Sequence, residues 1–176
     1  MKNLFILLTF LMFNCKGQNS EIQLKDLEFN SIFAQTEHDS VNIYSLLGLG
    51  FFKAPSSSDA ETVIKNWIQN NKDAKVTLIS TLKNPKSNVN YIWLTDANGQ
   101  TINEYLVARG CFPGGAMMRP QTFEEMSRDE QEMYRENGVE WNVEVEVDRE
   151  LYEVFVERIR AAEEIARKSR LGIWGK

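Results

Sequence analysis

A short capped helix is encoded by Thr101-Ile102-Asn103-Glu104-Tyr105-Leu106-Val107-Ala108-Arg109-Gly110. Thr101 and Glu104 have the spacing of a capping box, in which the hydroxyl and the carboxylate each accept a hydrogen bond from a free N–H at the helix start. Gly110 predicts the end of the helix, because glycine readily adopts the left-handed conformation found there. A second stretch, Leu171-Gly172-Ile173-Trp174, closes the chain after a long amphipathic segment. The two stretches predict a C-terminal half in which a short helix and a long one belong together.

The long segment predicts a helix with one buried face. Its inward stripe has helical spacing and consists of Leu151, Phe155, Ile159, Ala162 and Ala166. On the opposite face, Glu163 with Arg167 and Glu164 with Lys168 have the spacing of favourable ion pairs. We interpret these charges as a solvated face.

Upstream, strands alternate with one more helix. Strand patterns occupy parts of 27–44, with a turn at 37–40, and recur at 76–79 and 91–94. Ser58 and Glu61 form a second candidate capping box, before a helix that ends at Asn70-Asn71. This order predicts an α+β fold, a five-stranded Greek-key barrel of the OB type with three or four helices packed on it.

The paired C-terminal stretches resemble the staphylococcal nuclease (thermonuclease-like) family. In that family a strand and turn lead into N-E-x-L-V-x-x-G, and the last helix ends on a G-I/L-W tail. The resemblance covers roughly Phe33 to Phe112 and Leu151 to Trp174. It implies a single domain over residues 26–176, with an acidic insertion at about 113–149 that the family pattern lacks.

The insertion has two distinct parts. Thr122 to Glu125 begins an expected extra helix that ends near Gly138, and residues 139–147 then alternate strictly between apolar and polar side chains. Period two predicts a half-buried strand with one acidic face. Either its carboxylates protect a sheet edge from pairing with another chain, or they form a recognition surface for a basic partner.

The N-terminus resembles an export signal. Met1-Lys2-Asn3 is basic, residues 4–13 are almost entirely apolar, and Cys15 follows directly. We expect residues 1–14 to be a lipoprotein signal peptide, Cys15 to be lipidated, and residues 15–25 to be a tether. The alternative is an ordinary signal peptide with an incidental cysteine. The expected location is the bacterial cell envelope, with the exported protein held on a membrane.

Charge narrows the range of partners. The net charge is −5, whereas nucleic-acid binders normally carry a basic stripe that neutralises phosphates. Nucleic acid is therefore disfavoured as a partner. With Cys15 lipidated, Cys111 would be the sole remaining cysteine and is expected to be a small buried side chain.

The family resemblance implies where nuclease chemistry would lie. Family nucleases hold a calcium ion on carboxylates, activate water with a glutamate, and bind the phosphate with two arginines. Glu37-His38-Asp39-Ser40-Val41 resembles the family's D-G-D-T-V. Asp39 would then match a calcium ligand, and Asp39, Ser40 and the downstream Lys86 become the candidate ligand-binding residues.

The remaining catalytic positions differ from the family. In the register of R-L-x-G-I-D-x-P-E, Ser45 replaces the arginine, Gly50 the aspartate, and Ser56 the glutamate. The Y-G-R motif corresponds to Lys86-Ser87-Asn88, and lysine does not reproduce the two-pronged arginine contact. Calcium prefers six to eight oxygens, roughly, and Asp39 with Glu37 would be a poor cage.

Three functional hypotheses follow. The first is a lipid-anchored protein with a nuclease-like domain that has no catalytic activity, needs no cofactor and binds an unknown protein or other ligand. The second is a calcium-dependent phosphodiesterase with a rearranged site around Asp39. The third is an inhibitor or immunity-type protein that uses its acidic insertion against a basic partner.

Overall fold

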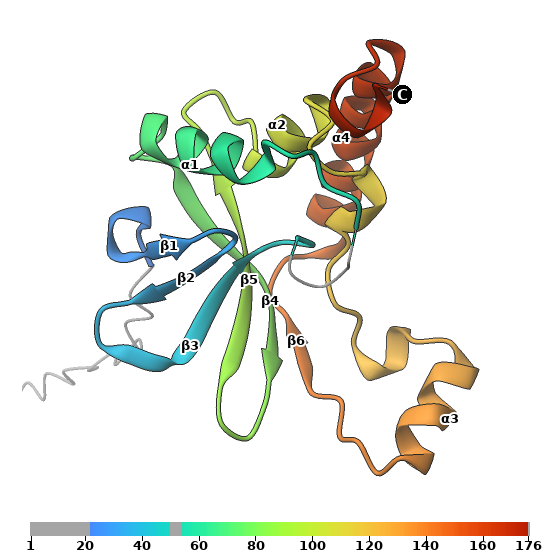
Figure 1. The fold of residues 1–176 in the computed structure, drawn as a ribbon. Coiled ribbons are helices and arrows are strands. Elements are labelled where there is room, and N and C mark those ends of the chain that lie inside the picture. The colour runs from blue at the N-terminus through green and yellow to red at the C-terminus, as the bar shows by residue number, and fades with distance from the viewer. Residues whose placement is uncertain (1–21, 50–53, 176) are drawn as a thin grey trace, which may run out of the picture.

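The computed structural model describes residues 22–49 and 54–175. The signal peptide and Cys15 expected from the sequence lie outside these residues, as does Gly50. The described elements follow one another along the chain (Figure 1): η1 (Leu24–Asp26), β1 (Glu28–Asn30), β2 (Phe33–Thr36), β3 (Asp39–Leu46), α1 (Ala60–Asn70), β4 (Lys75–Lys83), β5 (Asn88–Thr95), α2 (Ile102–Ala108), η2 (Gly114–Met117), η3 (Phe123–Glu125), α3 (Arg128–Glu136), β6 (Val143–Val145), α4 (Arg149–Lys168) and η4 (Gly172–Trp174).

The strands form one mixed sheet in the order β1-β2-β3-β5-β4-β6. Every neighbouring pair is antiparallel except β3 and β5, which run parallel with Asn42 opposite Asn88 and Leu46 opposite Ile92. β4 and β5 form a long hairpin, and β6 adds to the far edge of β4 with Glu144 opposite Thr81. The α+β class is therefore confirmed.

The sheet differs from the expected barrel in two respects. It has six strands among the described residues, because part of the insertion, β6, pairs with β4. In addition, β1 pairs only with β2 and β6 only with β4 in this part of the chain, so the sheet is open and a closed five-stranded barrel is not confirmed. Only Val143–Val145 of the alternating segment 139–147 forms a strand.

Helix α4 packs on one face of the sheet. Its Phe155 ring lies 4.4 Å from that of Trp93 on β5. Phe155, Ile159, Ala162 and Ala166 are buried as predicted, but Leu151 is 49% exposed. Leu151 was wrongly assigned to the buried stripe, since it is the third residue of α4, in the exposed first turn where its N–H donates to the capping Asp148 carboxylate.

The two stretches that resemble the family meet in space. The capping box of α2 is confirmed: Glu104 N–H donates to Thr101 Oγ1 over 3.2 Å, and Thr101 N–H donates to Glu104 Oε2 over 2.9 Å. At the other end of α2, the Gly110 carbonyl accepts a hydrogen bond of 2.9 Å from Ile173 N–H. The short helix and the C-terminal tail are thus joined backbone to backbone at Gly110.

Helix α1 begins one residue later than a Ser58 cap would require. Its N-cap is Asp59, which forms no side-chain hydrogen bond to the helix and instead accepts one from the Ser57 hydroxyl. The Ser58–Glu61 capping box is therefore wrong, although the helix ends at Asn70 as expected. Ile64 and Trp67 of α1 are buried in the main core.

The insertion extends from the side of the molecule that carries α4 (Figure 1). Thr122 and Glu125 do form a capping box, but only on the single turn η3, and the α-helix α3 starts separately at Arg128. Trp141 Nε1–H donates to the Gln121 carbonyl over 2.7 Å, which ties the end of the insertion to its beginning.

Among the helices described in 22–49 and 54–175, none is long and apolar enough to cross a membrane.

Arg119 anchors the insertion near its start. Its guanidinium forms two hydrogen bonds to the Glu125 carboxylate, of 2.8 and 2.6 Å, and lies over the Tyr152 ring of α4. The hydrogen bond from Arg119 lowers the pKa of Glu125 to about 2. This pair ties the insertion to the first turns of α4.

Candidate functional site

Asp39, the best family match, starts β3 and has both carboxylate oxygens engaged. Oδ1 accepts the backbone N–H groups of Val41 and Asn42 at 2.9 and 3.0 Å, and Oδ2 accepts Asn42 Nδ2–H at 2.6 Å. The Asn42 side chain, followed by the two backbone N–H groups, lowers the pKa of the Asp39 carboxyl below its usual value. The carboxylate therefore holds the start of β3 in place.

Asn42 connects Asp39 to a row of polar side chains across the sheet. Its Oδ1 accepts hydrogen bonds from Asn88 Nδ2 at 3.1 Å and from Asn90 Nδ2 at 3.2 Å. Asn90 Oδ1 in turn accepts the Thr81 hydroxyl at 2.8 Å. We call this set the amide row: Asp39, Asn42, Asn88, Asn90 and Thr81. It crosses from β3 over β5 to β4.

Strand register places the amide row on a single face. Asn42 lies opposite Asn88, and Asn90 opposite Thr81, so their side chains point to the same side. Lys83 and Glu144 continue this face onto β4 and β6, where they form an ion pair. Trp93, which contacts Phe155 of α4, is an odd number of residues from Asn90 along β5, so its side chain points to the other face of the sheet. The face covered by α4 is therefore opposite the one that carries the amide row.

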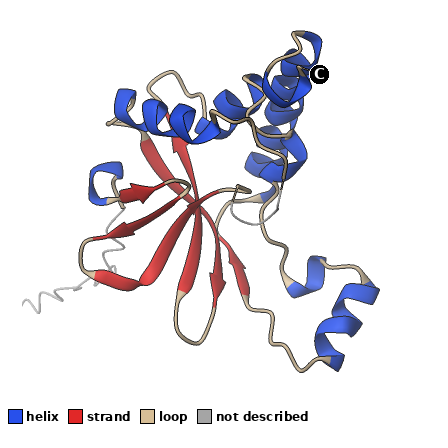
Figure 2. Cartoon of the chain, in the orientation of Figure 1, coloured by secondary structure: helices blue, strands red, loops and turns tan. Residues whose placement is uncertain are grey.

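The face that carries the amide row is apolar and buried at one end of the strands and polar and half-buried at the other. Leu46 and Ile92 are buried at one end, whereas Asn42 and Asn88 are only half-buried at the other. In Figure 2, the ends of β3, β4 and β5 nearest the β4–β5 hairpin extend beyond α1, α2 and α4. The polar half of the sheet thus lies away from those helices.

The other two candidate ligand-binding residues do not join Asp39 by hydrogen bonds. Ser40 is exposed on β3, and Lys86 is exposed in the 84–87 loop between β4 and β5. The parallel register of Asn42 with Asn88 brings both to the same end of the sheet. Glu37 and His38 are exposed in the preceding turn, with 3.8 Å between Glu37 Oε2 and His38 Nε2.

The position that matches the family's first arginine is enclosed. Ser45 is fully buried, and its hydroxyl donates to the Leu46 carbonyl over 3.3 Å. Ser56, at the position of the glutamate, is exposed in the segment before α1. The side chains at these two positions carry no charge that could activate water or bind a phosphate.

Residues 22–49 and 54–175 contain no group of three or more His, Cys, Asp or Glu side chains placed to hold a metal ion. Asp39 is the single carboxylate of the amide row, and its two oxygens already accept three N–H groups. Calcium prefers about six to eight oxygen ligands, several of them anionic, so the residues placed here do not complete a calcium site.

No protein-family model matches this chain, and no curated protein matches it. Among solved structures, it is similar to the extended Tudor domain of Tudor-SN (p100) from Drosophila melanogaster. That similarity has a TM-score of 0.39 and 19% sequence identity, and it covers 76% of this chain and 47% of the other. The chain thus spans about half the length of that structure. At this TM-score the similarity is too distant to assign a family or a function.

The amide row was not predicted from the sequence. Its signal is modest: Asn88 and Asn90 alternate with Val89 and Tyr91 inside a strand, where asparagine is uncommon. Asparagine in a strand needs a hydrogen-bonding partner when it is buried. The partners Asn42 and Thr81 are distant in sequence, so the row becomes visible only once the three strands are paired.

Proposed function

We propose that this chain is an exported, lipid-anchored binding module with a nuclease-like scaffold that has no nuclease activity. The observation that carries the proposal is the state of Asp39, whose two oxygens accept three N–H groups from its own strand. The proposed ligand site is the exposed end of the amide row, with Ser40 and Lys86 at its rim. Amide groups there would donate and accept hydrogen bonds from a polar ligand.

The strand arrangement supports the scaffold part of the proposal. Antiparallel β1, β2 and β3 precede a crossover that sets β3 beside β5 instead of β4. A helix then leads from β5 into the C-terminal elements, and the two family-like stretches contact each other at Gly110. We propose that β1 to β5 correspond to the OB-type barrel and that β6 is an addition from the insertion.

Calcium titration tests the proposed state of Asp39. Because the carboxylate is bonded to N–H donors, isothermal titration with Ca²⁺ will give no saturable heat at micromolar concentrations, and Asp39→Ala will behave like the wild type. Asp73→Ala, in the exposed turn after α1, is the matched control. Stoichiometric calcium binding that Asp39→Ala removes and Asp73→Ala leaves intact would contradict the proposal.

The membrane anchor is tested separately. Metabolic labelling with a tagged fatty acid will mark the wild-type chain and not Cys15→Ser, and the variant will leave the membrane fraction. Cys111→Ser is the control, because Cys111 is buried and burial raises the pKa of its thiol. Equal labelling of the wild type and Cys15→Ser would rule out lipidation at Cys15.

The inhibitor hypothesis has weaker support. Of the carboxylates expected to meet a basic partner, Glu144 is already paired with Lys83 on the sheet face. Glu140 and Glu146 are exposed. A salt-sensitive complex lost when Glu140 and Glu146 are neutralised would favour this hypothesis over the amide-row proposal.

A further inference from the structure

Helix α4 has a second apolar stripe, separate from the one that faces the core. Four side chains on it are exposed: Leu151 (49%), Val154 (52%), Ala161 and Ile165 (56%). They are spaced by three, seven and four residues, which places them on one line along a helix. From Leu151 to Ile165 the stripe is about 21 Å long, at 1.5 Å per residue.

One border of the stripe faces α2. Arg158 lies within the same line, but its guanidinium donates to Glu104 Oε1 of α2 over 2.8 Å and to the Gly99 carbonyl over 2.7 Å. Its charge is therefore paired on the α2 side, although the Arg158 side chain remains 45% exposed. We call Leu151, Val154, Ala161 and Ile165 the outer stripe.

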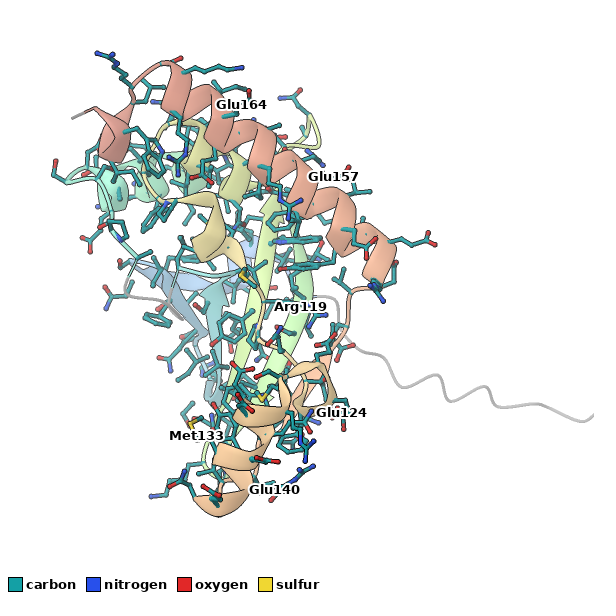
Figure 3. The ribbon with its side chains drawn as sticks, turned by 90° about the vertical axis from the view of Figure 1, so that its right-hand side faces the viewer. Arg119, Glu124, Met133, Glu140, Glu157 and Glu164 are labelled. Carbon is teal, nitrogen blue, oxygen red and sulfur yellow. The ribbon has the colours of Figure 1, made fainter. Side chains whose placement is uncertain are left out.

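The other border of the outer stripe is acidic. Glu150, Glu157 and Glu164 recur every seven residues beside it, as flanking positions do in a coiled coil. Figure 3 shows Glu157 and Glu164 along α4. Glu164 is paired with Lys168, whereas Glu150 and Glu157 have no hydrogen bond or ion pair among the described residues.

We propose that the outer stripe docks an amphipathic helix of a partner protein whose flanking positions are lysine or arginine. The apolar line matches the seam of a coiled coil, in which a partner helix inserts its own apolar side chains. The row of carboxylates supplies the charge complementarity that selects a basic partner. This surface lies on α4, so the inference goes beyond the ligand site proposed on the opposite face of the sheet.

A second copy of the chain fits the surface poorly. In an antiparallel pair the two glutamate rows would face each other, and like charges repel. In a parallel pair each row would meet positions occupied by Phe155 and Ala162, which are buried in the core. Neither arrangement supplies a cation.

The test uses two synthetic peptides of about three heptads, with leucine at the seam positions of both. One has lysine at the flanking positions and the other glutamate. The lysine peptide will bind the full-length chain saturably, and its affinity will fall when salt is raised, because screening weakens surface charge pairs. The glutamate peptide will not bind. Failure of the lysine peptide to bind, or equal binding of both, would overturn the proposal.

Variants locate the binding surface. Leu151→Ser with Ile165→Ser will weaken binding of the lysine peptide about tenfold or more, equivalent to about 1.4 kcal/mol, while Val139→Ser, at an exposed site on the insertion, will not. Glu150→Gln with Glu157→Gln and Glu164→Gln will remove most of the salt dependence. The matched control neutralises Glu124, Glu136 and Glu140 on the insertion. An equal loss of salt dependence in this control would overturn the proposal.

Two further measurements test whether the outer stripe binds a second copy of the chain or a lipid surface instead. In sedimentation we expect no dimer that forms through the outer stripe. A concentration-dependent dimer that Ile165→Ser abolishes would assign the stripe to a second copy of the chain and overturn the proposal. Flotation with phosphatidylcholine vesicles, using Cys15→Ser to remove the anchor, should show no stripe-dependent binding. Vesicle binding lost in the stripe variant would assign the surface to lipid and overturn the proposal. None of these outcomes depends on the amide row.

Discussion

Replacing Gly110 with alanine will lower the free energy of unfolding by about 2–5 kcal/mol. Gly110 has a φ of +68°, a conformation that costs other residues about 1–2 kcal/mol. A Cβ there would also lie 2.2 Å from the Leu171 carbonyl oxygen and 2.6 Å from its carbon. Backbone atoms cannot move aside as a flexible side chain can, so overpacking adds about 1–3 kcal/mol. Urea denaturation followed by circular dichroism measures the change.

Gly99→Ala is the matched control for this prediction. Gly99 also has a positive φ, of +80°, but a Cβ there would meet no atom within 4 Å. The free energy of unfolding of Gly99→Ala should fall only by the conformational cost, about 1–2 kcal/mol. Equal losses at the two positions would show that Gly110 and the C-terminal tail are not in close contact.

Replacing Asn103 with aspartate will destabilise the fold by about 3–5 kcal/mol near neutral pH, the cost of an unpaired buried charge. Asn103 is fully buried, and its Nδ2 donates to the Leu47 carbonyl at 2.9 Å and to Met117 Sδ at 3.1 Å. Aspartate has nearly the same shape, but its carboxylate would replace this donor with an acceptor. The change therefore isolates hydrogen bonding from packing.

The destabilisation at position 103 will depend on pH. Burial beside a carbonyl raises the folded-state pKa of the new carboxyl group above its unfolded value of about 3.9. The penalty is therefore present above the folded pKa and shrinks as pH falls toward the unfolded value. Denaturation at pH 8 and pH 5 measures this difference. Asn98→Asp, in the exposed turn before α2, should show little change, and a pH-independent loss at 103 would contradict the predicted burial.

Local patterns predicted the C-terminal half well. The capping box of Thr101 and Glu104, the stop at Gly110 and the buried stripe of α4 from Phe155 onward rely on interactions within a few residues or on helical spacing, and all are confirmed. The pair Glu163–Arg167 is also present, with 2.7 Å between Arg167 Nη2 and Glu163 Oε1. Such features need no knowledge of the tertiary fold.

Strand pairing was the part that the sequence did not reveal. The alternation over 139–147 indicated a strand, but not that it would extend β4 and leave the sheet open. The amide row likewise depends on β3 lying beside β5, two strands that are separated by α1 and β4. Asp39 was identified by resemblance, and its hydrogen bonds to its own strand emerged only from the geometry.

The most direct test of the central claim is a nuclease assay titrated with calcium, on the wild type and Asp39→Ala. Because Asp39 is occupied by N–H donors and Ser45 is buried at the arginine position, we expect no calcium-dependent cleavage of single- or double-stranded DNA by either protein. Robust cleavage that requires calcium and disappears in Asp39→Ala would contradict the account and establish a working, rearranged nuclease site.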